Sequence, residues 1–247
     1  MARFASYLRL AATLLALMAG AAQAGPPLLT DDPEPTETGH WEIYGPYMDG
    51  EGRGADFEGS TGVEINYGAA ANLQLTLGLP LAYAHAPAHW QAGAGDLELS
   101  AKYRFYHDPE KGVQIAFFPG VTLPTARHDL GAGRATGFLP LWFQKDNGAW
   151  TAFGGGGYTL NPGLGNKNFW RGALAVTRQI SPPLLLGWEA TREGASTVDG
   201  RASTRLGMGA IYQLAAPFRL LGRAGPIFED GTKKAGFHFF LALGLDY

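Results

Sequence analysis

Ionisable side chains occupy alternate positions in several stretches whose other positions are apolar. In residues 97–105, Glu98, Lys102 and Arg104 lie between Leu, Ala, Tyr and Phe residues. Successive side chains of a β-strand point to opposite faces, so this spacing puts the charges on one face of a strand. Charges of both signs inside a pore can select solutes by charge. The candidates for such a constriction are Glu64, Glu98, Lys102, Glu189, Arg205 and Arg223.

Three of these residues are expected to lie together. A hairpin centred on Thr197 would set Glu189 opposite Arg205, and the next turn would bring Arg223 beside them near mid-depth. Two interpretations stay open. The cluster can be a salt-bridged interior that satisfies buried charge and stiffens the wall, or a constriction that selects solutes by charge.

Histidines offer little basis for metal binding or catalysis. His85 and His89 are four residues apart, but Pro87 excludes the helical geometry in which such a pair binds one metal ion. His128 and Asp129 fit a solvated loop pair, because no Ser can be tied to them by spacing as a triad requires.

A lipid-modifying enzyme would need a nucleophile within hydrogen-bond reach of a His. Of the six His, only His238 lies well inside an expected strand, whereas Ser100 and Ser203 lie on other strands. We therefore expect no enzyme, no cofactor and no metal site, and keep the lipid-modifying enzyme as the weaker alternative.

Strict alternation of apolar and polar residues predicts about twelve β-strands. Residues 73–83 and 237–247 each place only Leu, Phe and Tyr on one face. The expected strands lie near His40–Tyr47, Gly59–Gly68, Asn72–Ala84, Gly95–Tyr106, Gly112–Pro124, Ala135–Lys145, Gly148–Leu160, Asn168–Ile180, Leu184–Glu193, Arg201–Gln213, Phe218–Phe228 and Ala235–Tyr247.

The connections alternate in length, which is typical of a bacterial outer-membrane barrel. The longer ones are Met48–Glu58, His85–Ala94, Thr125–Arg134, Asn161–Lys167, Gly194–Gly200 and Glu229–Lys234. We predict an all-β, transmembrane, antiparallel up-and-down barrel of about twelve strands with a narrow lumen. A soluble barrel or sandwich is the alternative, and it would reverse which face meets solvent.

Gly and Pro within the expected strands predict local irregularities. Gly154–Gly157 precede Tyr158 rather than a helix carrying Lys, so they indicate a strand kink or room for a bulky neighbour and not a phosphate loop. A Pro lacks the backbone donor that the ladder needs, so bulges or shifted boundaries are expected. The prolines concerned are Pro80, Pro119, Pro140 and Pro226.

The chain starts with the features of a secretory signal peptide. Arg3 and Arg9 precede an apolar run, and Ala22-Gln23-Ala24 is a small-x-small cleavage site. A membrane anchor is the alternative, but about 13 apolar residues are fewer than the roughly 20 that a spanning helix needs. The expected organisation is a signal peptide (1–24), a short periplasmic segment (25–39) and an outer-membrane barrel (40–247).

The last expected strand and the overall charge indicate partners. Its apolar face ends in an aromatic residue and fits the assembly signal of outer-membrane proteins, formed by Phe239, Leu241, Leu243, Leu245 and Tyr247. The partners are then outer-membrane lipid and the outer-membrane assembly machinery. A formal net charge of -3 with scattered Lys and Arg argues against nucleic-acid binding, and the absence of Cys means that no disulfide stabilises the fold.

Three stretches carry a family resemblance. They are Pro27-Leu28-Leu29-Thr30-Asp31-Asp32-Pro33 with His40-Trp41-Glu42-Ile43-Tyr44, Gly93-Ala94-Gly95-Asp96-Leu97-Glu98-Leu99-Ser100-Ala101-Lys102-Tyr103-Arg104-Phe105, and Pro119-Gly120-Val121-Thr122-Leu123-Pro124-Thr125. The second is similar to the G-x-G-D-x-E-x-x-x-K-Y-R-F stretch of the outer-membrane transporters called "MetA-pathway of phenol degradation". The resemblance implies transport of small hydrophobic or aromatic solutes and offers no catalytic residues. A barrel that binds surfaces through loops such as Ala84–Ala94, without transport, is the alternative.

Overall fold

The chain forms one continuous antiparallel β-sheet. The computed structural model describes residues 28–86, 89–127 and 130–247, so the expected signal peptide and the His128–Asp129 pair lie outside the described residues. The strands are β1 (Trp41–Arg53), β2 (Asp56–Ala70), β3 (Leu73–Ala86), β4 (His89–Ala94), β5 (Leu97–Asp108), β6 (Val113–Phe117), β7 (Gly120–Leu123), β8 (Thr136–Asn147), β9 (Trp150–Leu160), β10 (Phe169–Ser181), β11 (Leu184–Glu193), β12 (Ser203–Ala215), β13 (Phe218–Glu229) and β14 (Ala235–Asp246).

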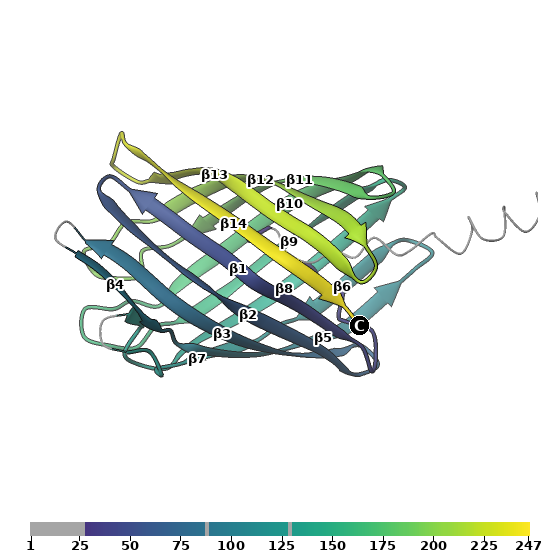
Figure 1. Cartoon of the computed structure of the whole chain (residues 1–247), viewed down its shortest axis with the longest axis horizontal. Helices are drawn as coiled ribbons and strands as arrows, with labels where there is room; N and C mark the ends of the chain where they lie inside the picture. Colours follow the sequence, from purple (N-terminus) through teal and green to yellow (C-terminus); the bar gives the residue numbers. More distant parts are fainter. Residues whose placement is uncertain (1–27, 87–88, 128–129) are drawn as a thin grey trace, which may run out of the picture.

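The sheet closes on itself because β1 pairs with β14 (Figure 1). β4 and β5 lie end to end along β3, and β6 and β7 lie end to end between β5 and β8. The result is a barrel of 12 strand positions, which confirms the predicted fold class. We call the end with Trp41 and Tyr247 the turn end, and the opposite end, with the longer connections, the loop end.

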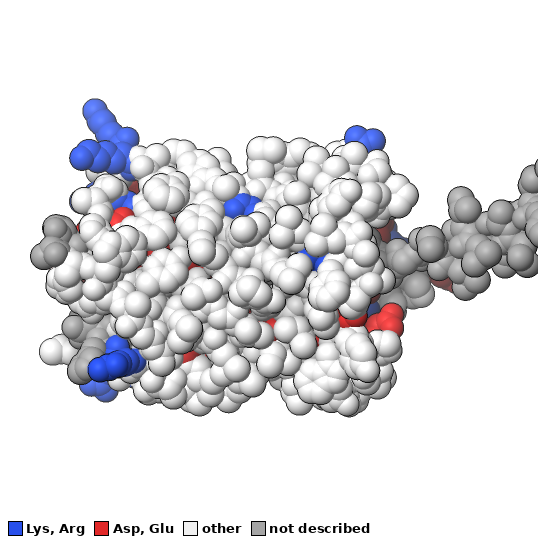
Figure 2. All heavy atoms as spheres, in the orientation of Figure 1, with Lys and Arg blue, Asp and Glu red and all other residues white. Residues whose placement is uncertain are grey.

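The outer face of the barrel is apolar. Leu75, Leu81 and Leu241, all assigned to the apolar face from the sequence, are 47%, 56% and 51% exposed. Charged atoms concentrate near the two ends of the barrel, and the flank between them is mostly uncharged (Figure 2). Such a band is the surface that a membrane-spanning barrel presents to lipid. None of the described residues belongs to a helix that is long and apolar enough to cross a membrane.

Most of the described residues in two expected loops belong to β-strands. Residues 48–58 belong to the paired strands β1 and β2 apart from a tight turn between them, and β4 takes up part of the expected loop at 85–94. Two glycines of the first stretch are covered by rings on the outer face. A Cβ added at Gly50 would lie 2.8 Å from the ring of Phe239, and one at Gly52 would lie 2.4 Å from that of Phe237. Aromatic cover of this kind stabilises glycine within a strand.

The irregularities expected at proline are present. Pro119 separates β6 from β7, and Pro140 lies on β8 opposite this break. Pro80 lies where the partner of β3 changes from β4 to β5. Pro226 pairs with Phe237 on β14, while β12 and β13 show no pairing on its other side between Arg205 and Met208.

The glycine run lies in β9, as a strand feature. A Cβ at Gly155 or Gly157 would lie 2.0 Å or 2.2 Å from the carbonyl oxygen of Leu141 or Leu139 on β8. Only glycine fits such an approach of backbone to backbone. β9 therefore contributes no side chain to the inner wall at these two positions, between β8 and β10.

Candidate permeation pathway

Residues 28–36, most of them buried, lie inside the barrel, and we call them the inner segment. Leu28, Thr30 and Asp32 are 7%, 3% and 1% exposed. The segment continues through residues 37–40 into β1 at the turn end. Residues 25–39 were predicted to form a short periplasmic segment, and residues 28–36 of this stretch occupy the turn-end half of the lumen.

Lys102 on β5 holds the inner segment through charge. Its Nζ donates hydrogen bonds to Oδ1 of Asp31 at 2.8 Å and to the carbonyl oxygen of Glu34 at 3.3 Å, and it lies 3.8 Å from Asp32. Burial raises the pKa of the Asp32 carboxyl well above its usual value, and the ammonium of Lys102 opposes this shift only in part. Burial also raises the pKa of Glu34.

Glu189 and Gln74 hold the same segment through hydrogen bonds. Oε2 of Glu189 on β11 accepts from the backbone N and from Oγ1 of Thr30, at 2.9 Å and 3.0 Å. Oε1 of Gln74 on β3 accepts from the backbone N of Thr36 at 2.8 Å. The contacts come from widely separated strands, so they tie the inner segment to several sides of the wall.

Three cavities lie in the described lumen. One of about 340 Å³ lies toward the loop end, one of about 430 Å³ surrounds the inner segment, and one of about 360 Å³ lies along β5, β7 and β8. Leu29 and Arg171 line all three. The three cavities therefore share a wall formed by Leu29 of the inner segment and Arg171 of β10.

The six residues predicted for a constriction occupy two levels of the lumen. Lys102 and Glu189 contact the inner segment, and Glu64 and Glu98 line the cavity around it. Arg205 and Arg223 line the cavity toward the loop end. The structure thus places all six on the inner wall, as the alternation predicts, while their role as a constriction stays a prediction.

The strand register corrects only the expected position of Arg205 directly opposite Glu189, whereas Arg223 interacts electrostatically with both Glu189 and Arg205, as the predicted grouping requires. Glu189 faces Gly207 on β12, and Arg205 faces Thr191. Arg205 instead forms an ion pair with Glu51 of β1 at 3.0 Å. This shift of two residues keeps every side chain on its predicted face.

Toward the loop end, ion pairs connect strands across the lumen. Arg205 also lies 3.6 Å from Glu193, which pairs with Arg171 at 3.2 Å. Arg223 pairs with Asp49 of β1 at 3.2 Å. Sequence reasoning missed the two acidic partners on β1, Asp49 and Glu51, because they lie in the stretch expected to be a loop.

His238 has a structural partner. Its Nε2 lies 3.0 Å from the carbonyl oxygen of Leu206, which is on β12 opposite Pro226, where no backbone N–H can donate. Ser203 Oγ accepts from Arg205 at 3.2 Å. Within the described residues the structure therefore brings neither Ser203 nor Ser100 into a hydrogen bond with His238, as a lipid-modifying enzyme would need.

The stretch Gly93–Phe105 has roles at three places. The carboxylate of Asp96 accepts hydrogen bonds from the backbone N of Ala126 at 2.9 Å and of Ala132 at 2.7 Å, which fixes the loop between β7 and β8. Glu98 lines the lumen, and Lys102 binds the inner segment. These polar residues thus join the wall, its largest loop and the inner segment.

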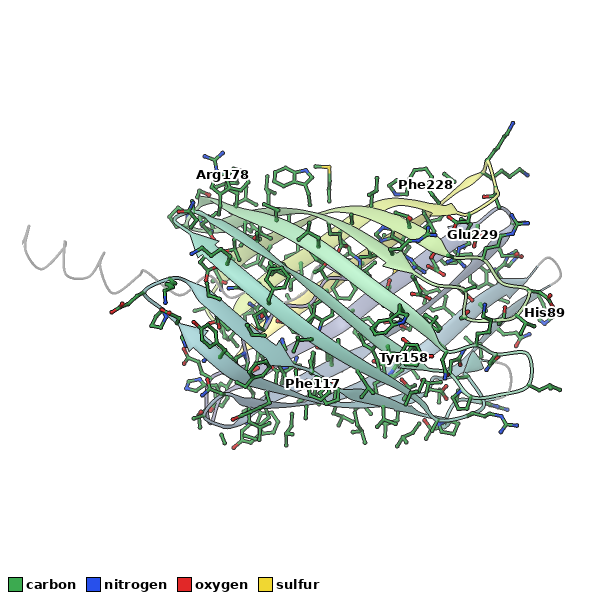
Figure 3. The ribbon with its side chains drawn as sticks, turned by 180° about the vertical axis from the view of Figure 1, so that it is seen from behind. His89, Phe117, Tyr158, Arg178, Phe228 and Glu229 are labelled. Carbon is green, nitrogen blue, oxygen red and sulfur yellow. The ribbon has the colours of Figure 1, made fainter. Side chains whose placement is uncertain are left out.

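His85 and His89, the two histidines whose spacing was considered for a metal site, contact aromatic and amide groups. The His85 ring lies 4.9 Å from that of Trp90, and Nε2 of His89 lies 3.0 Å from Nε2 of Gln91. Figure 3 shows His89 at the loop end, opposite the end where Arg178 points away from the barrel.

Comparisons with known proteins support the fold. No family model matches the sequence, and no curated protein matches it. An outer membrane channel from Pseudomonas putida F1 aligns with a TM-score of 0.69 at 15% identity, covering 91% of this chain and 100% of that one. The NanC porin aligns with a TM-score of 0.59 at 8% identity, covering 83% and 98%. The KdgM porin aligns with a TM-score of 0.54 at 6% identity, with the same coverage. At these identities the likeness establishes a shared barrel fold.

Proposed function

We propose that this protein is a bacterial outer-membrane channel for small hydrophobic or aromatic solutes. The observation that carries the proposal is the set of three cavities that share a wall at Leu29 and Arg171 inside a barrel with an apolar outer band. A solute crosses such a barrel without a catalytic step, and charge and pore width select it. The similar folds include an outer membrane channel and two porins, which supports the same class.

Export and assembly follow from the same proposal. Residues 1–24 would direct secretion and be removed, and the last strand would present the assembly signal. Two residues of this signal, Leu241 on the outer face of β14 and Tyr247 directly after it, are 51% and 81% exposed. Their exposure leaves them accessible to the assembly machinery and to lipid.

The inner segment supports a second candidate, a barrel without transport that binds surfaces through its loops. Hydrogen bonds to Glu189, Lys102 and Gln74 hold this segment in the turn-end half of the lumen. If this segment stays in place under all conditions, it keeps the lumen closed, and the protein would then act by binding surfaces through its loops.

Solute flux into liposomes carrying the refolded protein distinguishes the channel from the surface-binding barrel. A heat-modifiable shift in gel mobility confirms that the barrel is folded. We expect phenol and related aromatic solutes to enter faster than sugars. Absence of flux through a folded barrel, for every solute tried, would contradict the channel and favour the surface-binding barrel.

A further inference from the structure

Arg171 of β10 presents an exposed guanidinium to the lumen beside an apolar surface. Gly157 of β9 lies between Pro140 on β8 and Arg171 on β10 and places no side chain between these strands. The guanidinium carbon of Arg171 therefore reaches across β9 to the ring of Phe138, 5.3 Å from its centroid. The ring of Phe169 lies 5.4 Å from the same atom. The two rings fix the guanidinium at the wall that the three cavities share.

Arg171 retains hydrogen-bonding capacity. Its Nε pairs with Glu193 at 3.2 Å, and its side chain is 45% exposed. A guanidinium has five N–H donors in a planar fork. Arg171 also interacts electrostatically with Glu98, but no hydrogen bond engages its Nη groups within the described residues, so these donors are available to a ligand.

The surroundings select the chemistry of that ligand. Leu29, Phe138, Trp142 and Ala173 give the loop-end cavity an apolar side. Its volume, about 340 Å³, lies within the range of about 300–1,000 Å³ usual for small-molecule sites. Trp142 is 5% exposed, and its indole N–H has no hydrogen-bond partner among the described residues.

The charged residues around Arg171 limit the net charge that a ligand of this cavity can carry. Glu193 already balances part of the Arg171 charge, and Glu98 and Asp31 line the adjoining cavities. Arg205 and Arg223, which line the same cavity as Arg171, form ion pairs with Glu51 and Asp49. These carboxylates repel a ligand with two negative charges, and Arg171 repels a cation. A single carboxylate satisfies the free Nη groups, because carboxylate and guanidinium match in planar geometry.

We propose that Arg171, Phe138 and Trp142 form a binding subsite for small aromatic monocarboxylates. The carboxylate would bind Arg171, and the ring would lie against Phe138 and Trp142. This inference deepens the proposed channel function and rests on it, because the subsite would select the solutes that cross the lumen.

Ligand binding by the intact protein in detergent micelles tests the subsite, with benzoate, phenol and benzylamine as probes. We expect benzoate to bind more tightly than the other two. Arg171→Gln should weaken benzoate binding about 10- to 100-fold, which corresponds to loss of a hydrogen bond to a charged group, and leave phenol unchanged. Phe138→Ala should weaken both benzoate and phenol.

Arg178→Gln is the matched control, because Arg178 lies on the same strand but on the outer face, over the ring of Trp150 at 5.0 Å. It should leave benzoate binding unchanged. Equal binding of benzoate to the wild type and to folded Arg171→Gln would overturn the subsite. An equal loss of benzoate binding in Arg171→Gln and Arg178→Gln would overturn it as well.

Flux measurements separate this inference from the proposed function. A folded wild type that passes ions and sugars but binds no benzoate keeps the channel and overturns the subsite. Binding of benzoate that depends on Arg171, in a barrel without flux of any solute, supports the subsite and overturns the channel.

Discussion

Nζ of Lys102 and Oδ1 of Asp31 lie 2.8 Å apart inside the barrel, where they join the wall to the inner segment. The Lys102 side chain is only 5% exposed, and Asp32 adds a second carboxylate at 3.8 Å. Removing one partner of a buried ion pair costs about 3–5 kcal/mol, because the other charge stays desolvated. Lys102 is therefore one of the groups that hold the inner segment in the lumen, together with Glu189 and Gln74.

Replacing Lys102 by Met should release the inner segment and widen the lumen. We expect single-channel conductance in planar bilayers to rise several-fold, because Asp31 and Asp32 gain hydration outside the barrel. Lys111→Met is the control, since Lys111 pairs with Asp108 at an exposed turn. Equal conductance of the wild type and a folded Lys102→Met variant would show that the segment does not block flow.

Conductance should increase with pH. The pKa values of Asp32 and Glu34 are raised by burial in the inserted segment, so the inserted state binds protons more tightly than the released state. Insertion is then most stable at and below the ordinary carboxyl pKa of about 4 and weakens as the pH rises through the raised values. We expect larger conductance at about pH 8 than at about pH 5.

Asp32→Asn tests the origin of this pH dependence. The amide remains neutral at all pH values, so the variant should stay in the low-conductance state and lose much of the response. Asp199→Asn in an exposed loop should respond like the wild type. Higher wild-type conductance at low pH than at high pH would contradict the assigned cause.

Alternation predicts the faces of the strands but not their partners. The period of two placed Leu75, Leu81 and the six candidate residues on the correct faces, because one face meets lipid and the other the lumen. It could not fix the register of β11 against β12, since Glu189 opposite Gly207 or Arg205 leaves every face unchanged. Loop geometry decides between these registers, and it carries no periodic signal.

The inner segment escaped prediction because its prolines and acidic residues show no period. A signal was present in the charges. Neither strand expected beside Lys102, residues 72–84 or 112–124, contains Asp or Glu. A buried Lys needs an acidic partner, and the nearest adjacent pair ahead of the barrel is Asp31-Asp32. Asp49 and Glu51 were missed for another reason. The neighbouring Gly50 and Gly52 have no apolar side chain that would mark a strand face, and the Phe237 and Phe239 rings that cover them lie far away in sequence.

Arg205 should govern ion selectivity toward the loop end. It lies 3.0 Å from Glu51 and 3.6 Å from Glu193. Arg205→Gln leaves these carboxylates with less neutralising charge, so the permeability ratio of K⁺ to Cl⁻ should rise several-fold in reversal-potential measurements. Arg192→Gln is the control, because Arg192 pairs with Asp230 in an exposed ion pair. Unchanged selectivity in a conducting Arg205→Gln barrel would remove the constriction hypothesis.

Arg219 of β13 stabilises the seam where the barrel closes. It is 2% exposed, forms ion pairs with Glu42 of β1 and Asp246 of β14, and donates a hydrogen bond to the Tyr44 hydroxyl at 2.7 Å. A Cβ at Gly244 would lie 2.7 Å from Cγ of Arg219, so glycine makes room for this side chain. The first and last strands are thus joined by charge as well as by backbone hydrogen bonds.

Arg219→Met should destabilise the folded barrel by about 3–5 kcal/mol, because Glu42 and Asp246 remain as poorly hydrated charges at the seam. The midpoint of urea unfolding in micelles, followed by the heat-modifiable gel shift, would fall accordingly. Adding Glu42→Gln and Asp246→Asn to Arg219→Met removes those charges and should restore part of the loss. An unchanged midpoint for Arg219→Met, or a further decrease in the triple variant, would contradict stabilisation of the seam by the ion pairs of Arg219.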